Sequence, residues 1–183
     1  MPGSSRQRNY VKKLVYASLF AALTCVGAWV TIPLPFVPIT LQTLFVILSG
    51  GVLGAYFGAL SMIVYVLLGL AGLPVFSKGQ SGLGVLFGPT GGYLIGFVLC
   101  AIVVGYLAER RKSPGYLWYC SIMALGTIVL YSAGVAGLIL ITHMNPVNAV
   151  LIGVVPFIPG DIVKILVAAW IAKKVRDEKM LQV

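Results

Sequence analysis

The sequence predicts an all-α integral membrane protein: one membrane domain built as a bundle of six transmembrane helices, with a glycine-rich outer loop between helices three and four. Of its 183 residues, 60% are hydrophobic and only 9% are charged. Because an apolar run of about 20 residues is enough to cross a bilayer as a helix, this length allows about six crossings. The loops between them are short and leave no room for a soluble catalytic domain.

We expect the spans at residues 10–32, 41–55, 57–71, 91–109, 115–142 and 147–173. In the first, Lys12 and Lys13 precede an apolar run from Leu14 to Ile32, which is interpreted as a retained helix because further spans follow it without an obvious cleavage site. Within it, Ala17 and Ala21 share one face, where small side chains let another helix approach closely. The alternative is that alanine is simply common in membrane helices.

Three prolines within residues 33–38 cannot continue a helix and predict an extended connection. A polar cluster of Thr40, Gln42 and Thr43 then opens the second span. Thr40 has an alternative role as a helix cap, whereas Gln42 is a candidate for lining a site. A tight connection at Ala55-Tyr56 is expected between the second and third spans, where crowded glycines indicate close packing rather than a phosphate loop.

Residues 71–90 form the longest segment expected to be non-helical. The segment is rich in glycine yet carries apolar side chains, so we interpret it as a lid over a site rather than a flexible linker. Its Ser77 and Lys78 are candidate ligand contacts. At the start of the fourth span, Thr90 is a candidate cap, Gly92 permits close approach of a ligand or a neighbouring helix, and Tyr93 is a further candidate.

The last span contains Asp161 and Lys164, three residues apart in an apolar segment that follows Pro159. A charge inside a membrane costs at least about 2.5–3.5 kcal/mol, so such residues usually face a cavity or one another. Pro159 suits a helix's first turn, which places Asp161 near the positive end and Lys164 one turn further. The pair is either an anchor for a small polar ligand or a buried ion pair that satisfies only itself.

Basic residues predict the orientation. In a six-span chain, all but two of the 13 lie on one face, which the tendency of positive loops to stay inside makes the cytoplasmic face, with both termini. These are Arg6, Arg8, Lys12, Lys13, Arg110, Arg111, Lys112, Lys173, Lys174, Arg176 and Lys179. The outer face then holds the 32–40 connection, residues 71–90 and the start of the last helix. We therefore expect an apolar-walled ligand site there, on which five residues converge: Gln42, Lys78, Tyr93, Asp161 and Lys164.

Several function classes are excluded. The net charge of +9 sits at span ends and does not predict nucleic-acid binding. The three cysteines and the single histidine have no metal-site spacing, and we expect no metal or cofactor. Among four acidic residues only Asp161 lies within a span, so an intramembrane enzyme has no paired acids. No P-loop is present, and no polar stripe suggests a channel.

Four segments carry a resemblance to a known family: 33–43 (PLPFVPITLQT), 69–76 (GLAGLPVF), 88–93 (GPTGGY) and 156–164 (PFIPGDIVK). In this order they resemble the BioY family, the biotin-specific S components of energy-coupling factor (ECF) transporters. The resemblance covers the chain from the first span to the last.

The resemblance implies a multi-pass protein of a prokaryotic plasma membrane that captures biotin at its outer face. It further implies a transmembrane coupling (T) subunit, met by Ala17 and Ala21, and two ATPase (A) subunits that use ATP. Asp161 would accept a ureido N–H of biotin, and Lys164 or Lys78 would neutralise the carboxylate. A stand-alone vitamin carrier, or an S component for thiamin or riboflavin, is the alternative.

Overall fold

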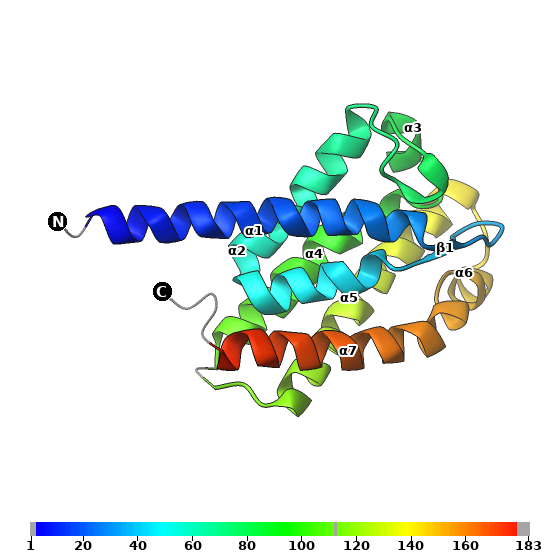
Figure 1. The fold of residues 1–183 in the computed structure, drawn as a ribbon. Helices are drawn as coiled ribbons and strands as arrows, with labels where there is room; N and C mark the ends of the chain where they lie inside the picture. The colour runs from blue at the N-terminus through cyan, green and yellow to red at the C-terminus, as the bar shows by residue number, and fades with distance from the viewer. Residues whose placement is uncertain (1–2, 112, 179–183) are drawn as a thin grey trace.

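The computed structural model describes residues 3–111 and 113–178, the first four by backbone only. It is a bundle of helices with one short β-hairpin (Figure 1). The long helices are α1 (Gly3–Trp29), α2 (Gln42–Leu70), α4 (Gly91–Glu109), α5 (Tyr116–Thr142) and α7 (Ile158–Asp177). The short elements are β1 (Thr31–Ile32), β2 (Ile39–Thr40), η1 (Ser77–Gly79), α3 (Leu83–Leu86), α6 (Pro146–Gly153) and η2 (Val155–Phe157), where η denotes a 3₁₀ turn.

Within the described ranges, five helical stretches are long and apolar enough to cross a membrane. They are Gln7–Trp29, Gln42–Leu70, Gly91–Glu109, Tyr116–Thr142 and Pro146–Asp177. Many large apolar side chains on their outer faces are exposed, which is the distribution expected where lipid rather than water surrounds the protein.

The count of five treats α2 as one helix, but α2 is folded into two segments, 42–53 and 55–70. Between them Gly54 has φ 82° and ψ −179°, a conformation essentially restricted to glycine. The segments then pack so closely that a Cβ atom on Gly58 would lie 3.0 Å from the Cα atom of Gly50. The connection that was expected at Ala55-Tyr56 is thus a sharp kink at Gly54, without a separate loop.

Local sequence signals set the other connections. β1 and β2 pair antiparallel, Thr31 with Thr40 and Ile32 with Ile39, around the proline-rich turn. The Asn145 side chain caps α6 by accepting a hydrogen bond of 2.9 Å from the Val147 N–H. The apolar residues 146–157, which lead into the last long helix, therefore form a short helix followed by a 3₁₀ turn.

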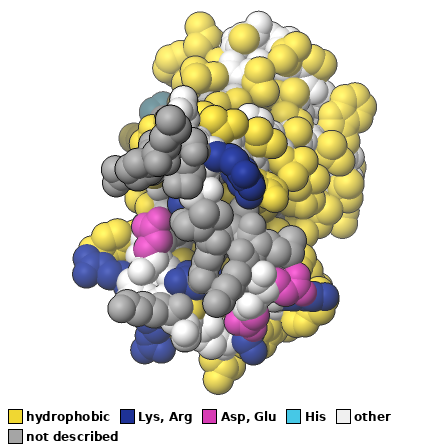
Figure 2. All heavy atoms as spheres, turned by 60° about the vertical axis from the view of Figure 1, so that its left-hand side comes forward, with side chains coloured by type: hydrophobic (Ala, Val, Ile, Leu, Met, Phe, Trp, Pro, Cys, Tyr) yellow, Lys and Arg dark blue, Asp and Glu magenta, His cyan; other side chains and the backbone are white. Residues whose placement is uncertain are grey.

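The two ends of the bundle differ in chemistry. The start of α1, the α4–α5 connection and the end of α7 share one end (Figure 1). Charged side chains gather there, with an apolar surface beyond them (Figure 2). We call it the basic end; the opposite end, which holds the hairpin and residues 71–90, is the loop end. Of the basic residues assigned to one face, Lys112, Lys179 and the Arg6 side chain lie outside the described residues.

Ala17 and Ala21 of α1 face the interior. Their exposed fractions are 3% and 1%, and both belong to the core that α1 forms with α2. Their small size therefore serves packing within this chain, and the partner contact that the resemblance implied for them does not fit this placement. Among the α1 side chains that the structure describes, from Gln7 onward, the exposed small residues are Ser18 and Ala22.

The kink yields a test of the fold. Gly54→Ala should lower the stability of the purified chain by about 1–3 kcal/mol, because alanine disfavours this backbone conformation and its Cβ would collide with the Glu109 carboxylate. Thermal unfolding in detergent measures the loss. Gly84→Ala is the matched control, since a Cβ there meets nothing within 4 Å. Equal losses in the two variants would contradict the role of the kink.

Candidate ligand-binding site

A cavity with about 570 Å³ of empty space lies at the loop end, where α2, α4, α5 and α7 meet beneath residues 71–90. Most of its wall is apolar or aromatic, and a few polar groups converge on it, which is the usual construction of a small-molecule site. The polar lining residues are Thr40, Gln42, Thr43, Ser77, Gln80, Thr90 and Lys164. The aromatic ones are Tyr65, Phe76, Tyr93, Phe97, Tyr131 and Phe157.

Lys164 contributes the charged group of the wall, and its position is fixed by three acceptors. Its Nζ atom donates to the Thr40 carbonyl at 2.8 Å, to Thr43 Oγ1 at 2.8 Å and to Asp161 Oδ1 at 3.0 Å. These acceptors come from the end of β2, the first turn of α2 and the first turn of α7, so the ammonium group joins the two helices and the hairpin. Its three donors are all used, and the charge is compensated inside the bundle.

Asp161 stands behind Lys164 and does not line the cavity itself. Only 5% of the residue is exposed. Besides the lysine, its carboxylate accepts hydrogen bonds from the Tyr131 hydroxyl and, at 3.3 Å, from the Thr43 hydroxyl. Pro159 lies in the first turn of α7, and Asp161 follows it in the same turn.

Gln42 connects the cavity to the segment that covers it. Its side-chain oxygen accepts from the Thr40 hydroxyl at 3.0 Å, and its side-chain nitrogen donates to the Tyr65 hydroxyl. Tyr65 in turn donates to the Val75 carbonyl at 3.3 Å. Phe76, the next residue, is buried with its ring 5.6 Å from that of Tyr65. The start of α2 is therefore linked by hydrogen bonds to residues 71–90.

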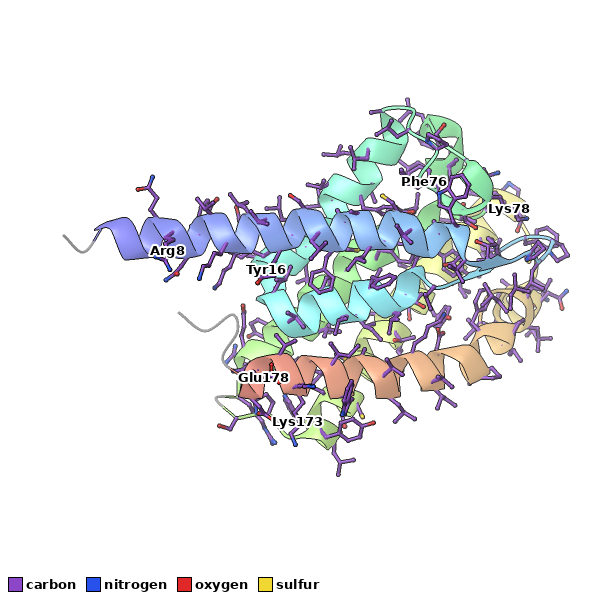
Figure 3. The ribbon with its side chains drawn as sticks, viewed as in Figure 1. Arg8, Tyr16, Phe76, Lys78, Lys173 and Glu178 are labelled. Atoms are coloured by element: carbon purple, nitrogen blue, oxygen red, sulfur yellow. The ribbon has the colours of Figure 1, made fainter. Side chains whose placement is uncertain are left out.

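Residues 71–90 cover the cavity as the sequence suggested, and they are held to the hairpin. Lys78 donates to the Leu34 carbonyl at 3.2 Å, and the hydroxyl groups of Thr31 and Ser77 are 3.4 Å apart. Figure 3 shows Phe76 and Lys78 on this segment, at the end of the molecule away from Arg8 and Lys173. Lys78 is exposed at the rim, whereas Phe76 points inward.

Two aromatic residues hold the far wall. The Tyr93 hydroxyl donates to the Gly153 carbonyl at 2.9 Å, which fastens α4 to the end of α6. The ring of Tyr131 lies 6.3 Å from that of Tyr93 and 5.9 Å from that of Phe157. The rings of Tyr93, Tyr131 and Phe157 meet edge-on or tilted and give this wall an apolar aromatic surface.

The structure brings five of the predicted site residues together at the cavity: Thr40, Gln42, Ser77, Tyr93 and Lys164. Asp161 is one layer behind them, and Lys78 is at the rim. Gly92 lies elsewhere, in the contact between α4 and α5, where a Cβ would come within 2.9 Å of the Gly137 Cα. Of the two roles considered for Gly92, close approach to a neighbouring helix is the one this geometry has.

Sequence reasoning missed Tyr65 and Tyr131, whose hydroxyl groups bind Gln42 and Asp161. The available signal was a polar atom deep in an apolar run, which must find a partner once it is buried. Thr43 was seen as part of a polar cluster but not chosen as a site residue. It carries contacts to both charged groups of the pair.

Comparison with known proteins shows which family the chain belongs to. Residues 3–179 match the model of the BioY family. The chain belongs to the BioY family. A relative called biotin transporter BioY, from Thermotoga maritima, is 46% identical over 166 residues, which are 91% of this chain and 96% of the relative. Its namesake from Rhizobium etli is 38% identical over 174 residues, with 90% and 92% coverage.

The fold of this BioY-family chain also matches a solved structure, described as the S-component for biotin from an ECF-type ABC transporter. The TM-score is 0.86 at 29% sequence identity, and 93% of each chain is covered. The all-α membrane fold predicted from the sequence is thereby confirmed for this member of the BioY family.

Proposed function

We propose that this chain is the biotin-binding S component of an ECF-type importer and takes biotin into the cavity at the loop end. The observation that carries the proposal is the position of Lys164. In this chain of the BioY family, the Lys164 side chain is held by Asp161 and Thr43 and lines a cavity whose wall is largely aromatic. The relatives called biotin transporters support biotin as the ligand.

The charges suggest which end of biotin enters first. Asp161 and Lys164 neutralise each other, so a neutral cyclic urea adds no net charge to the buried region. A carboxylate placed there would leave a negative charge without its own partner, which is much more costly. We therefore expect the ureido head near Lys164 and Gln42, and the carboxylate at the rim near the exposed Lys78.

In this arrangement Asp161 acts mainly through its neighbours. Its carboxylate already accepts two hydroxyl hydrogen bonds and the lysine, so a ureido N–H would have to replace one of these donors. Lys164 lines the cavity, and its ammonium would give up one of its three present hydrogen bonds to donate to the ureido carbonyl. Asp161 then sets the charge and position of Lys164 and the direction of the Tyr131 hydroxyl.

Uptake also needs an energy source, and the sequence has no nucleotide-binding loop. We propose the coupling and ATPase subunits of an ECF transporter as partners, with the basic end in the cytoplasm of a prokaryotic cell. On α1, the exposed Ser18 and Ala22 form the surface on which a partner helix could approach most closely.

The ligand and its direction are tested by calorimetric titration of the purified chain. Biotin should bind, and thiamin and riboflavin should not. Lys164→Met should weaken biotin and its uncharged methyl ester alike, by about tenfold or more, because it removes a charged donor. Lys78→Gln should weaken only the free acid, by at most about fivefold, because that charge is exposed. A loss confined to the free acid in Lys164→Met would reverse the proposed direction.

The partner surface is tested by one substitution on α1 and a matched one on α5. Ala22→Phe should leave biotin binding unchanged and reduce ATP-dependent uptake in liposomes that hold the coupling and ATPase subunits. Its bulk would keep a partner helix at a distance. Ala136→Phe, which adds the same bulk on the exposed face of α5, should leave uptake intact. Equal uptake by both variants would exclude this face of α1 as the docking surface.

A further inference from the structure

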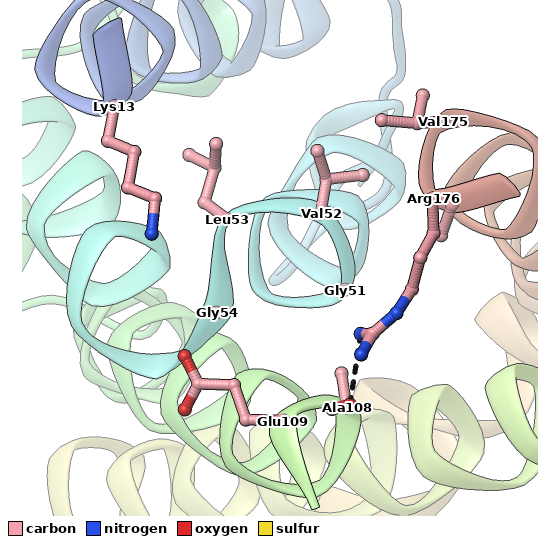
Figure 4. Close-up of a pocket in the computed structure, with 10 residues that line it drawn as sticks. Lys13, Gly51, Val52, Leu53, Gly54, Ala108, Glu109, Val175 and Arg176 are labelled. Atoms are coloured by element: carbon pink, nitrogen blue, oxygen red, sulfur yellow. Dashed lines mark hydrogen bonds between the residues drawn. The ribbon is translucent and has the colours of Figure 1, made fainter. Parts of the chain in front are cut away.

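A second cavity, with about 700 Å³ of empty space, lies at the basic end, beside the kink of α2. Figure 4 shows its wall: the kink at Gly54, the end of α4 at Glu109, Arg176 of α7 and Lys13 of α1. The rest of the wall includes the apolar side chains of Val52 and Val175. The cavity therefore combines charged groups with apolar surface where the four long helices α1, α2, α4 and α7 meet, and the biotin proposal does not use it.

The charges in this cavity are positive on balance, with two cations and one carboxylate. Among the described residues the Lys13 ammonium has no ion-pair partner; it lies 5.7 Å from the centre of the Phe57 ring. The Arg176 guanidinium closes the end of α4 by donating to the Ala108 carbonyl at 3.2 Å and to the Arg111 carbonyl at 2.8 Å. Its charge remains within the cavity wall.

The carboxylate of Glu109, also in the cavity wall, points at the kink of α2. It lies against Gly54, where helical segment 55–70 begins, and the free N–H groups of a helix start favour a negative charge. Figure 4 shows Lys13 and this carboxylate apart from each other, and no ion pair between them is found among the described residues. Lys13 is thus the cation of the cavity most available to an added anion.

Three aromatic residues mark the level of the membrane surface at this end. Each carries a cation over its ring: Arg110 over Tyr106 at 4.5 Å, Arg111 over Trp118 at 4.0 Å and Lys174 over Trp170 at 5.4 Å. Such aromatic residues concentrate at the depth of the lipid headgroups. Trp170 and Lys174 lie on the same turns of α7 as the cavity-lining Ala172, Val175 and Arg176, which places the cavity at the level of these aromatic residues.

We propose that this cavity binds the phosphate group of an anionic phospholipid from the leaflet at the basic end. Lys13 pairs with the phosphate, and the apolar wall at Val52 and Val175 receives the upper part of the acyl chains. Basic pockets between transmembrane helices on the cytoplasmic side are suited to such headgroups, and a zwitterionic lipid gains less because it carries its own cation.

The test uses native mass spectrometry of the full chain in detergent, titrated with dioleoylphosphatidylglycerol or dioleoylphosphatidylcholine. The wild-type chain should retain dioleoylphosphatidylglycerol more strongly than dioleoylphosphatidylcholine. Lys13→Gln should weaken that binding about fivefold, whereas Lys12→Gln, which removes the same charge from an exposed neighbour outside the cavity, should not. Glu109→Gln should strengthen it, because the opposing charge is removed.

Equal losses in Lys13→Gln and Lys12→Gln would overturn the proposal in favour of general attraction to the basic end. Equal retention of the two lipids by the wild-type chain would also overturn it. Displacement of the lipid by millimolar inorganic phosphate, with the same dependence on Lys13, would make free phosphate the ligand and refute a lipid. Biotin titration of the same preparations shows that each variant is folded, and it tests the proposed function separately.

Discussion

The buried ion pair between Asp161 and Lys164 is the interaction on which the loop end depends. A carboxylate or an ammonium alone would be costly in this apolar setting, and removal of one partner of a buried pair typically costs about 3–5 kcal/mol. Here the pair is completed by Thr40, Thr43 and Tyr131, so α7, α2 and α5 are joined at one point. The same contacts place the lysine at the cavity wall. One network thus supplies both the packing of three helices and the polar side of the site.

Each end of the bundle has its own cavity, and the two cavities differ in how they are covered and charged. At the loop end the hairpin and residues 71–90 cover the cavity and are linked to Gln42 through Tyr65, so a ligand that touches Gln42 is coupled to the cover. At the basic end, Lys13, Glu109 and Arg176 line a second cavity beside the kink of α2. The two cavities share no lining residue, and buried residues of α2 and α4 such as Val46, Ile47 and Cys100 lie between the two ends.

Much of the fold followed from the sequence, because apolar run length and proline position are strong constraints in a membrane. Lys164 could be found because a charge in an apolar run is rare. Tyr65 and Tyr131 could not, since a tyrosine in such a run gives no sign of where its hydroxyl group points. Ala17 and Ala21 show the limit of spacing arguments: the spacing fixes that two residues share a face, but contact with the rest of the bundle decides that the face is internal. The BioY resemblance supplied the expected partner, but it could not identify the exposed face.

A double-mutant cycle on biotin affinity tests the central claim most directly. Asp161→Asn and Lys164→Met should each weaken biotin by about tenfold or more. Because the two residues act as one unit, the double variant should lose far less than the sum of the two single losses in binding free energy. Additive losses, or wild-type affinity in either single variant, would contradict the account.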